Sequence, residues 1–254
     1  MSDFKINYLG NPRIKNPILI AGLPGIGNVG KVTVDFLIDS LGAKKFAEVS
    51  SYYFPSSVFV TEDNLISLPQ INLYFKRTKE QDVILLAGDV QPIDERSCYL
   101  FCEEILNVFE KYGGKEIITI GGIGLQKIPK VPKLYITGTD QAVIRKYKFC
   151  LSGIYGVVGP ILGVSGVLVG LAGRRKIPAV SLLAQTFAHP AYLGIKGARE
   201  ALKSISARLG VKLDIKRLDK EIEDLESELR VKTQQLVDLK ESMRPKSNKE
   251  NYFG

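Results

Sequence analysis

The stretch Pro17-Ile-Leu-Ile-Ala-Gly-Leu-Pro-Gly-Ile-Gly-Asn-Val-Gly30 decides the fold. Residues 17–22 are a short apolar run bounded by turn residues, which predicts a buried strand. Residues 29–41 then repeat apolar side chains at helical spacing, which predicts a helix. A strand, a glycine-rich turn and a helix in this order are typical of α/β proteins.

The segments on either side of this unit continue the alternation. Further strands are predicted at residues 48–53, 58–60, 72–75, 83–87, 116–120, 134–137 and 179–184. Helices are predicted at residues 95–112 and 191–209. Continuous apolar strands that alternate with helices indicate a sheet covered on both faces. We therefore predict an α/β core domain at residues 1–210, with a mostly parallel sheet sandwiched by helices.

Composition and segment lengths favour a cytoplasmic globular protein. Hydrophobic residues make up 45% of the chain and charged residues 24%, as in ordinary globular domains. Residues 154–172 approach transmembrane length, but their glycines and mid-chain position favour a buried turn and helix. Residues 1–10 lack the apolar core of a signal peptide. Three cysteines without a CxxC pair indicate a reducing compartment.

The last 44 residues carry a different pattern. Apolar residues recur at alternating steps of four and three, with one lysine in the series: Val211, Ile215, Leu218, Ile222, Leu225, Leu229, Lys232, Leu236, Leu239 and Met243. This heptad predicts a long helical arm at residues 211–243, followed after Pro245 by a mobile tail within residues 244–254. The arm either forms a coiled coil with another helix or folds against its own chain.

The segment Gly25-Ile-Gly-Asn-Val-Gly30 matches the G-x-G-x-x-G pattern of dinucleotide-binding turns. Such glycines let a pyrophosphate approach the N-terminus of a helix. The acidic residue expected about twenty positions later would be Glu48, which lies too early in its predicted strand to hold a ribose. A tight turn with close packing needs the same glycines, so a structural turn and an anion site both remain open.

Acidic residues after the strand at 83–87 form a second candidate site. Asp89, Asp94 and Glu95 follow the end of that strand, where ligands bind in open α/β sheets. Asp94 also fits a helix N-cap with Glu95 in the first turn. A small-molecule function would use the crevice that Gly25, Gly27, Gly121 and Asp89 line.

No catalytic, cofactor-binding or metal-binding residue is predicted. His189 is the single histidine, and the sequence contains neither a G-x-S-x-G serine as a catalytic partner nor a metal-binding motif that includes it. Cys98 and Cys102 lie one helical turn apart on the apolar face of their helix, which favours core thiols over ligands.

The net charge of +8 raises the question of nucleic-acid binding. Residues 211–254 carry ten basic and ten acidic residues, so the whole excess lies in residues 1–210. There the basic residues are dispersed among separate loops and helix ends, without the stripe that nucleic acid requires. We expect no nucleic-acid partner and no membrane partner.

The order of the glycine-rich and apolar segments carries a family resemblance, which spans roughly residues 10–240. The matching stretches are residues 17–30, 83–92, 119–124, 156–173 and 177–186. Together they resemble the proteasome assembly chaperone family of the archaeal, ATP-independent type. The resemblance implies a fold similar to nucleoside phosphorylases without their catalysis, a homo-oligomer, and 20S proteasome α-subunits as the partner.

The resemblance also extends to the C-terminus. Some members of that family end in a hydrophobic–Tyr–any motif that inserts into pockets between proteasome α-subunits. This chain ends Tyr252-Phe253-Gly254, which keeps the aromatic ring and loses the tyrosine hydroxyl. A pocket group that pairs with that hydroxyl would be left unpaired. These three residues are the predicted partner-binding site, and an inert tail is the alternative.

Overall fold

The computed structural model describes residues 3–189, 192–216 and 218–220. The contacts divide the chain into a unit of residues 1–215 and a unit of residues 216–254. The first unit holds the sheet and helices that the sequence predicts for the core domain. Its architecture is described below.

Eight strands form one sheet within the described part of residues 1–215. Their order across the sheet is β1 (Lys5–Tyr8), β3 (Lys44–Ser50), β6 (Ile71–Arg77), β7 (Asp82–Gly88), β2 (Ile18–Gly22), β8 (Glu116–Leu125), β10 (Ala179–Phe187) and β9 (Leu134–Gly138). Two short strands, β4 (Phe59–Val60) and β5 (Ile66–Ser67), form a separate antiparallel ribbon.

The sheet is mixed, which corrects the prediction of a mostly parallel sheet. The central strands β7, β2, β8 and β10 are parallel to their neighbours in this group. The pairs β1–β3, β3–β6, β6–β7 and β10–β9 are antiparallel. A four-residue link between β6 and β7 leaves no room for the crossover that parallel pairing requires. β6 also alternates between buried and partly exposed residues in its first half, as half-covered antiparallel strands do.

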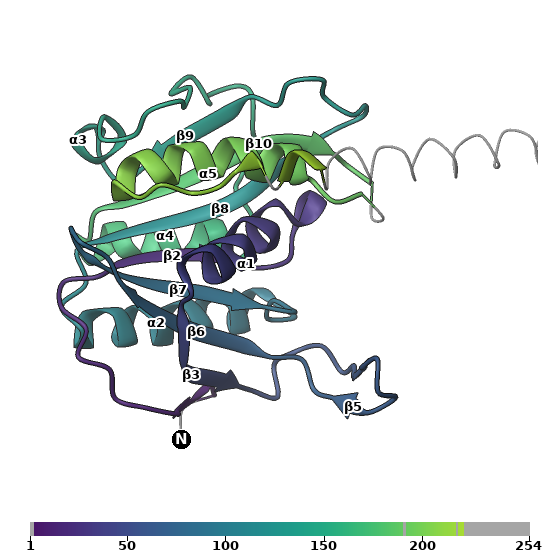
Figure 1. The fold of residues 1–254 in the computed structure, drawn as a ribbon, viewed down its shortest axis with the longest axis vertical. Coiled ribbons are helices and arrows are strands. Elements are labelled where there is room, and N and C mark those ends of the chain that lie inside the picture. The colour runs from purple at the N-terminus through teal and green to yellow at the C-terminus, as the bar shows by residue number, and fades with distance from the viewer. Residues whose placement is uncertain (1–2, 190–191, 217, 221–254) are drawn as a thin grey trace, which may run out of the picture. The chain divides into compact units, whose positions relative to one another are not determined.

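Helices cover both faces of the sheet (Figure 1). Helices α1 (Val29–Leu41) and α5 (Ile195–Leu209) pack together on one face. Helices α2 (Glu95–Lys111) and α4 (Val164–Arg174) pack together on the other. A single-turn helix, α3 (Gln141–Ile144), follows β9, and a 3-10 turn, η1 (Ile26–Asn28), precedes α1. Every residue of β2 and β7 is buried, since these strands lie between the two helical layers.

The apolar stretch at residues 154–172 forms an irregular segment followed by α4, as the turn-and-helix prediction expects. α4 has 11 residues and begins only at Val164. In the part of the chain that the structure describes, no helix combines the length and the apolar character needed to cross a membrane.

Residues 211–214 are not helical, whereas the heptad pattern predicts a helix from Val211. Helix α5 ends at Leu209, and the left-handed conformation of the following Gly210 (φ 64°) terminates it. Helical conformation resumes at Lys216. The heptad positions from Ile222 onward and the tail at 244–254 lie outside the described residues.

Candidate functional site

The glycine-rich turn lies at the carboxyl ends of the central strands, between β2 and α1. A methyl group on Gly22 would overlap the carbonyl oxygen of Gly30. One on Gly30 would lie 2.6 Å from the carbonyl oxygen of Ile120 on β8. The first turn of α1 therefore lies directly against β2 and β8, and the absence of side chains at these glycines permits that approach.

Other parts of the protein cover Gly27, whereas Gly25 is exposed. Gly27 has a positive φ of 62°, and a Cβ there would lie 2.5 Å from Oγ1 of Thr186 on β10. The backbone N–H of Gly194 donates to the carbonyl oxygen of Gly27 at 2.7 Å. A Cβ on Gly122 would overlap the carbonyl oxygen of Ile26. Protein atoms thus occupy the space beside Gly27 and Gly30, and this close packing favours the structural turn over the anion site.

Gln91 connects the turn to helix α4. Its Nε2 donates to the carbonyl oxygen of Pro24, and its Oε1 accepts from the backbone N–H of Val164 at 3.1 Å. The cavity beside it measures about 10 Å³, and its lining consists of Ala21, Leu23, Gln91, Ile120, Val164 and Ser165. That volume is enough for one water molecule, whereas ligand pockets measure several hundred Å³.

Asp89 forms an ion pair with Lys31, the residue that follows the last glycine of the turn. Lys31 Nζ lies 3.1 Å from Asp35 and 3.4 Å from Asp89. Burial alone would lower the pKa of Lys31, but the two carboxylates outweigh it and the net shift is upward. Burial raises the pKa of Asp35 despite the attraction of Lys31. The structure thus gives Asp89 a lysine partner within the chain.

Asp94 caps helix α2, in agreement with the capping interpretation. Its side chain accepts from the backbone N–H of Ser97 at 2.8 Å, and the Ser97 hydroxyl accepts from the backbone N–H of Asp94 at 3.2 Å. Glu95 stands in the first turn of the helix. This capping box satisfies N–H groups that a helix start otherwise leaves unpaired.

Two of the cysteines are buried, whereas the histidine is exposed. Cys98 and Cys102 lie on the buried face of α2, within the core. The ring of His189 stacks on Phe187, with centroids 5.5 Å apart and an angle of 7° between planes. Within residues 3–189, 192–216 and 218–220, no three His, Cys, Asp or Glu side chains gather as a metal site.

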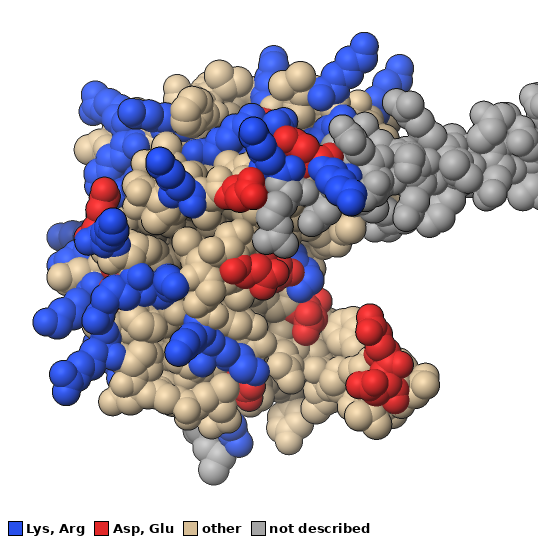
Figure 2. Space-filling view, in the orientation of Figure 1, with Lys and Arg blue, Asp and Glu red and all other residues tan. Residues whose placement is uncertain are grey.

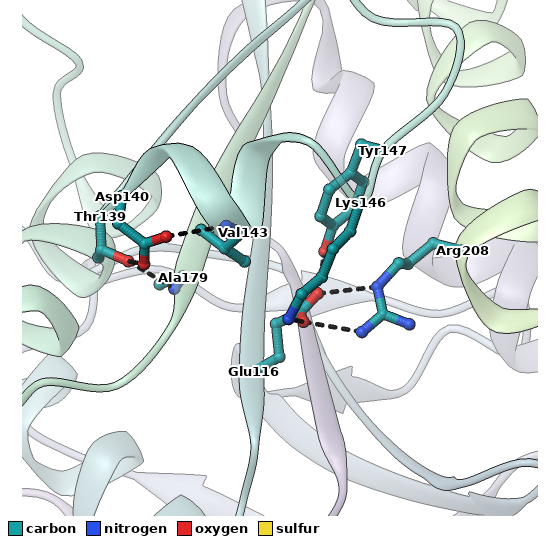
Figure 3. A network of polar contacts seen from close by, with 8 residues as sticks. All are labelled: Glu116, Thr139, Asp140, Val143, Lys146, Tyr147, Ala179 and Arg208. Carbon is teal, nitrogen blue, oxygen red and sulfur yellow. Dashed lines mark hydrogen bonds and ion pairs between the residues drawn. The ribbon is translucent and has the colours of Figure 1, made fainter.

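A buried polar cluster at the opposite end of β8 has no counterpart in the sequence predictions (Figure 3). Glu116, the first residue of β8, is 2% exposed. Its carboxylate accepts from Arg208 Nε at 3.0 Å and from Arg208 Nη2 at 2.7 Å. The Tyr147 hydroxyl donates to it at 2.5 Å, and Lys146 Nζ at 3.2 Å. The cluster fastens α5 and the segment after α3 to the sheet.

Burial alone would raise the pKa of Glu116, but the hydrogen bonds from Arg208 and Tyr147 and the charge of Arg208 lower it below its ordinary value. Burial raises the pKa of Tyr147, and the neighbouring Glu116 carboxylate raises it further. The cluster therefore holds a carboxylate and a neutral phenol. The sequence signal is an acidic residue that opens a strand otherwise rich in isoleucine.

The predicted partner-binding residues Tyr252, Phe253 and Gly254 lie outside the described residues. The structure places neither them nor their surroundings. Gly25, Gly27, Gly121 and Asp89 lie toward one edge of the sheet, where Gly27 and Gly121 pack against other side chains and Gly25 and Asp89 are exposed. They do not line the small cavity at these strand ends.

These features define an α/β sandwich with a parallel centre, antiparallel flanks and a glycine-rich turn that serves packing. The chain belongs to the PAC2 family, whose model matches residues 19–232. This confirms the family that the ordered glycine-rich segments predict.

Two similar proteins come from archaea. The crystal structure of Pyrococcus furiosus PbaB, described as an archaeal proteasome activator, is 29% identical and has a TM-score of 0.82, covering 91% of this chain and 98% of that one. An uncharacterized protein of Methanocaldococcus jannaschii, MJ1210, is 29% identical over 219 residues, which cover 84% of this chain and 81% of that protein.

A third protein shares the fold at lower identity. Pyrococcus furiosus PbaA, described as an archaeal homolog of proteasome-assembly chaperone, is 22% identical and has a TM-score of 0.73 in its monoclinic form. The match covers 94% of this chain and 95% of that chain. At this identity the likeness concerns the fold.

Proposed function

We propose that this chain is a homo-oligomeric, ATP-independent proteasome assembly chaperone or proteasome-binding protein. The likeness to PbaB carries the proposal, since it joins 29% identity to a TM-score of 0.82 over 91% of this chain. The partner is the 20S proteasome, engaged through its α-subunits. The protein acts in the cytoplasm.

The proposed function requires no catalytic step. The glycine-rich turn, the strongest motif for a bound cofactor, is filled by Thr186, Gly194 and Ile26. The cavity beside Gln91 measures about 10 Å³. Both observations argue against a small-molecule site at these strand ends.

The tail Tyr252-Phe253-Gly254 is the proposed contact with the α-subunits. Two aromatic rings and a terminal carboxylate suit an apolar pocket with a basic group at its end. Phe253 fills such a pocket without offering a hydroxyl, so each single contact is weak. Several tails on one oligomer compensate, because each docking event after the first becomes intramolecular.

Co-sedimentation of the full chain with isolated α-subunits tests the proposal. Deletion of residues 252–254, or the double change Tyr252→Ala and Phe253→Ala, is expected to weaken binding at least tenfold. Phe253→Tyr is expected to strengthen it, since it restores the hydroxyl. Lys249→Ala, a change outside the last three residues, is the matched control. Equal binding by the wild type and the deletion variant would refute the role of the tail.

A separate measurement tests the alternative that the protein binds a small molecule at the strand ends. Thermal unfolding in the presence of nucleosides, nucleotides or inorganic phosphate detects any ligand that binds the native state, because such a ligand raises Tm in a saturable way. We expect no saturable shift. A saturable shift that Gln91→Ala abolishes would establish a ligand site at the strand ends.

A further inference from the structure

The β4–β5 ribbon is separate from the eight-stranded sheet. It pairs Phe59 with Ser67 and Val60 with Ile66, and within the described residues it joins no other strand. Figure 1 shows it, at the label β5, projecting beyond the ends of β3 and β6. A ribbon with two paired residues in each strand is too short to be stable by its own contacts.

One face of this ribbon is apolar and open to solvent. Val60 lies opposite Ile66, and the period of two in a strand places Val58 and Leu68 on the same face. These four side chains are 50–73% exposed. A contiguous apolar surface of this kind on a protein marks an interaction site.

The turn of the ribbon adds negative charge to that surface. Glu62 and Asp63 are exposed there, and Figure 2 shows acidic side chains gathered at the end of the projecting segment. The ribbon thus presents apolar side chains beside two carboxylates. Its complement would be an apolar surface flanked by cations.

Residues 126–133, the loop that follows β8, have this complementary character. Ile128 is 40% exposed and Val131 is 78% exposed. Between and beside them stand the exposed lysines Lys127, Lys130 and Lys133. The backbone N–H of Lys133 donates to Gln185 Oε1 at 3.1 Å, and its carbonyl oxygen accepts from the backbone N–H of Gln185 at 3.0 Å. These bonds fix one end of the loop to β10.

The ribbon and the loop lie at the same edge of the sheet but at separate places. β3, which leads to the ribbon, runs in the same direction as β7 and β8, because it is antiparallel to β6 and β6 is antiparallel to β7. Both segments therefore leave the carboxyl edge. Four strand spacings separate β3 from β8, or about 19 Å at roughly 4.8 Å each. A contact between the ribbon and the loop is therefore one between two copies.

We infer that the β4–β5 ribbon of one copy docks on the 126–133 loop of a second copy, with Glu62 and Asp63 facing Lys127, Lys130 and Lys133. Two ribbons that met each other would instead bring like charges together. The head-to-tail contact leaves a free ribbon and a free loop at its two ends, so it extends into a closed ring or a filament. This inference rests on the homo-oligomer of the proposed function and names its interface.

Charge reversal in the full chain tests the interface, with particle mass measured in solution at one protein concentration. Glu62→Lys with Asp63→Lys is expected to shift the mass toward the monomer. Lys127→Glu with Lys130→Glu and Lys133→Glu is expected to do the same. A mixture of these two variants is expected to recover association beyond pairs in alternating order, because the acidic ribbon of one variant meets the basic loop of the other and the reversed ribbon meets the reversed loop. The five changes combined in one chain are expected to restore the wild-type mass.

The control reverses three exposed lysines elsewhere, Lys79, Lys115 and Lys148, and is expected to leave the mass unchanged. Circular dichroism verifies that each variant is folded. A monomeric wild type, or a charge-reversed ribbon that keeps the full mass, would overturn the inference. Co-sedimentation of each variant with α-subunits separates the two proposals. Loss of mass with residual binding supports this interface, whereas an oligomeric wild type that does not bind contradicts only the proteasome role.

Discussion

Glu116 at the start of β8 and Arg208 in the last turn of α5 form a two-pronged ion pair, with N–O distances of 3.0 and 2.7 Å. The two residues lie 92 positions apart in the chain. The carboxylate is 2% exposed, so its charge depends on protein partners rather than on water. The pair joins one helical layer to the middle of the sheet.

Removal of the arginine is expected to destabilise the protein strongly. Arg208→Ala leaves the buried Glu116 carboxylate without its main partner, a change that costs about 3–5 kcal/mol for buried pairs. Urea unfolding measures the loss. Arg174→Ala, at an exposed arginine in the last turn of α4, is the control and is expected to change stability by less than about 0.5 kcal/mol. Similar losses for both variants would contradict the buried pair.

The same carboxylate predicts a dependence of stability on pH. The folded state lowers the pKa of Glu116, so the unfolded state takes up its proton first as the pH falls. The stabilisation by Glu116 is complete above its unfolded pKa of about 4.3 and is lost as the pH falls through the folded value. Unfolding of wild type and Glu116→Gln, compared between pH 7 and pH 3, measures this contribution. The variant is expected to lose less stability on acidification than the wild type.

The close contact between α1 and β2 predicts that alanine destabilises the protein at one glycine and stabilises it at another. Gly22→Ala places a methyl group against the carbonyl oxygen of Gly30, and overpacking of this kind costs about 1–3 kcal/mol. Gly170 lies within α4 with nothing within 4 Å of a Cβ. Gly170→Ala is therefore expected to stabilise the protein by about 0.5–1 kcal/mol, through helix propensity. Thermal unfolding measures both changes. A lower Tm for Gly22→Ala and a higher Tm for Gly170→Ala would support the packing role of Gly22, whereas an unchanged Tm for Gly22→Ala would refute it.

Loss of the capping box of α2 is expected to lower the free energy of unfolding by less than loss of the Glu116–Arg208 pair. Asp94→Ala removes the side-chain acceptor for the N–H of Ser97 and is expected to cost about 1 kcal/mol. Asp94→Asn keeps an acceptor and is expected to retain most of the stability. Chemical denaturation measures the free energy of unfolding of the two variants and of the wild type. An equal loss in both would indicate that the carboxylate charge, rather than the hydrogen bond, stabilises the helix start.

Much of the local structure follows from the sequence. The predicted helix at residues 29–41 coincides with α1, because its apolar spacing and the following Gly42 define both its face and its end. The predicted strands at 83–87 and 179–184 lie within β7 and β10. These segments carry strong local signals, and local signals need no knowledge of distant residues.

The direction of the outer strands did not follow from the sequence. β6 and β9 are apolar enough to resemble central parallel strands, but the short link between β6 and β7 forces an antiparallel turn. The Glu116 cluster also could not be predicted from the sequence. Its members come from β8, the segment after α3 and the end of α5, and no spacing rule connects them.

The sequence by itself determined the strand–turn–helix units, the cap of α2 and the order of glycine-rich segments that marks the PAC2 family. Those features depend on periodicity, backbone conformation and side chains a few residues apart. Only the tertiary structure decided that Gly30 packs against β8 and Gly27 against β10, and that Glu116 meets Arg208. A glycine permits close approach to a ligand or to protein alike, so the packing of distant strands decides which of them occupies the space.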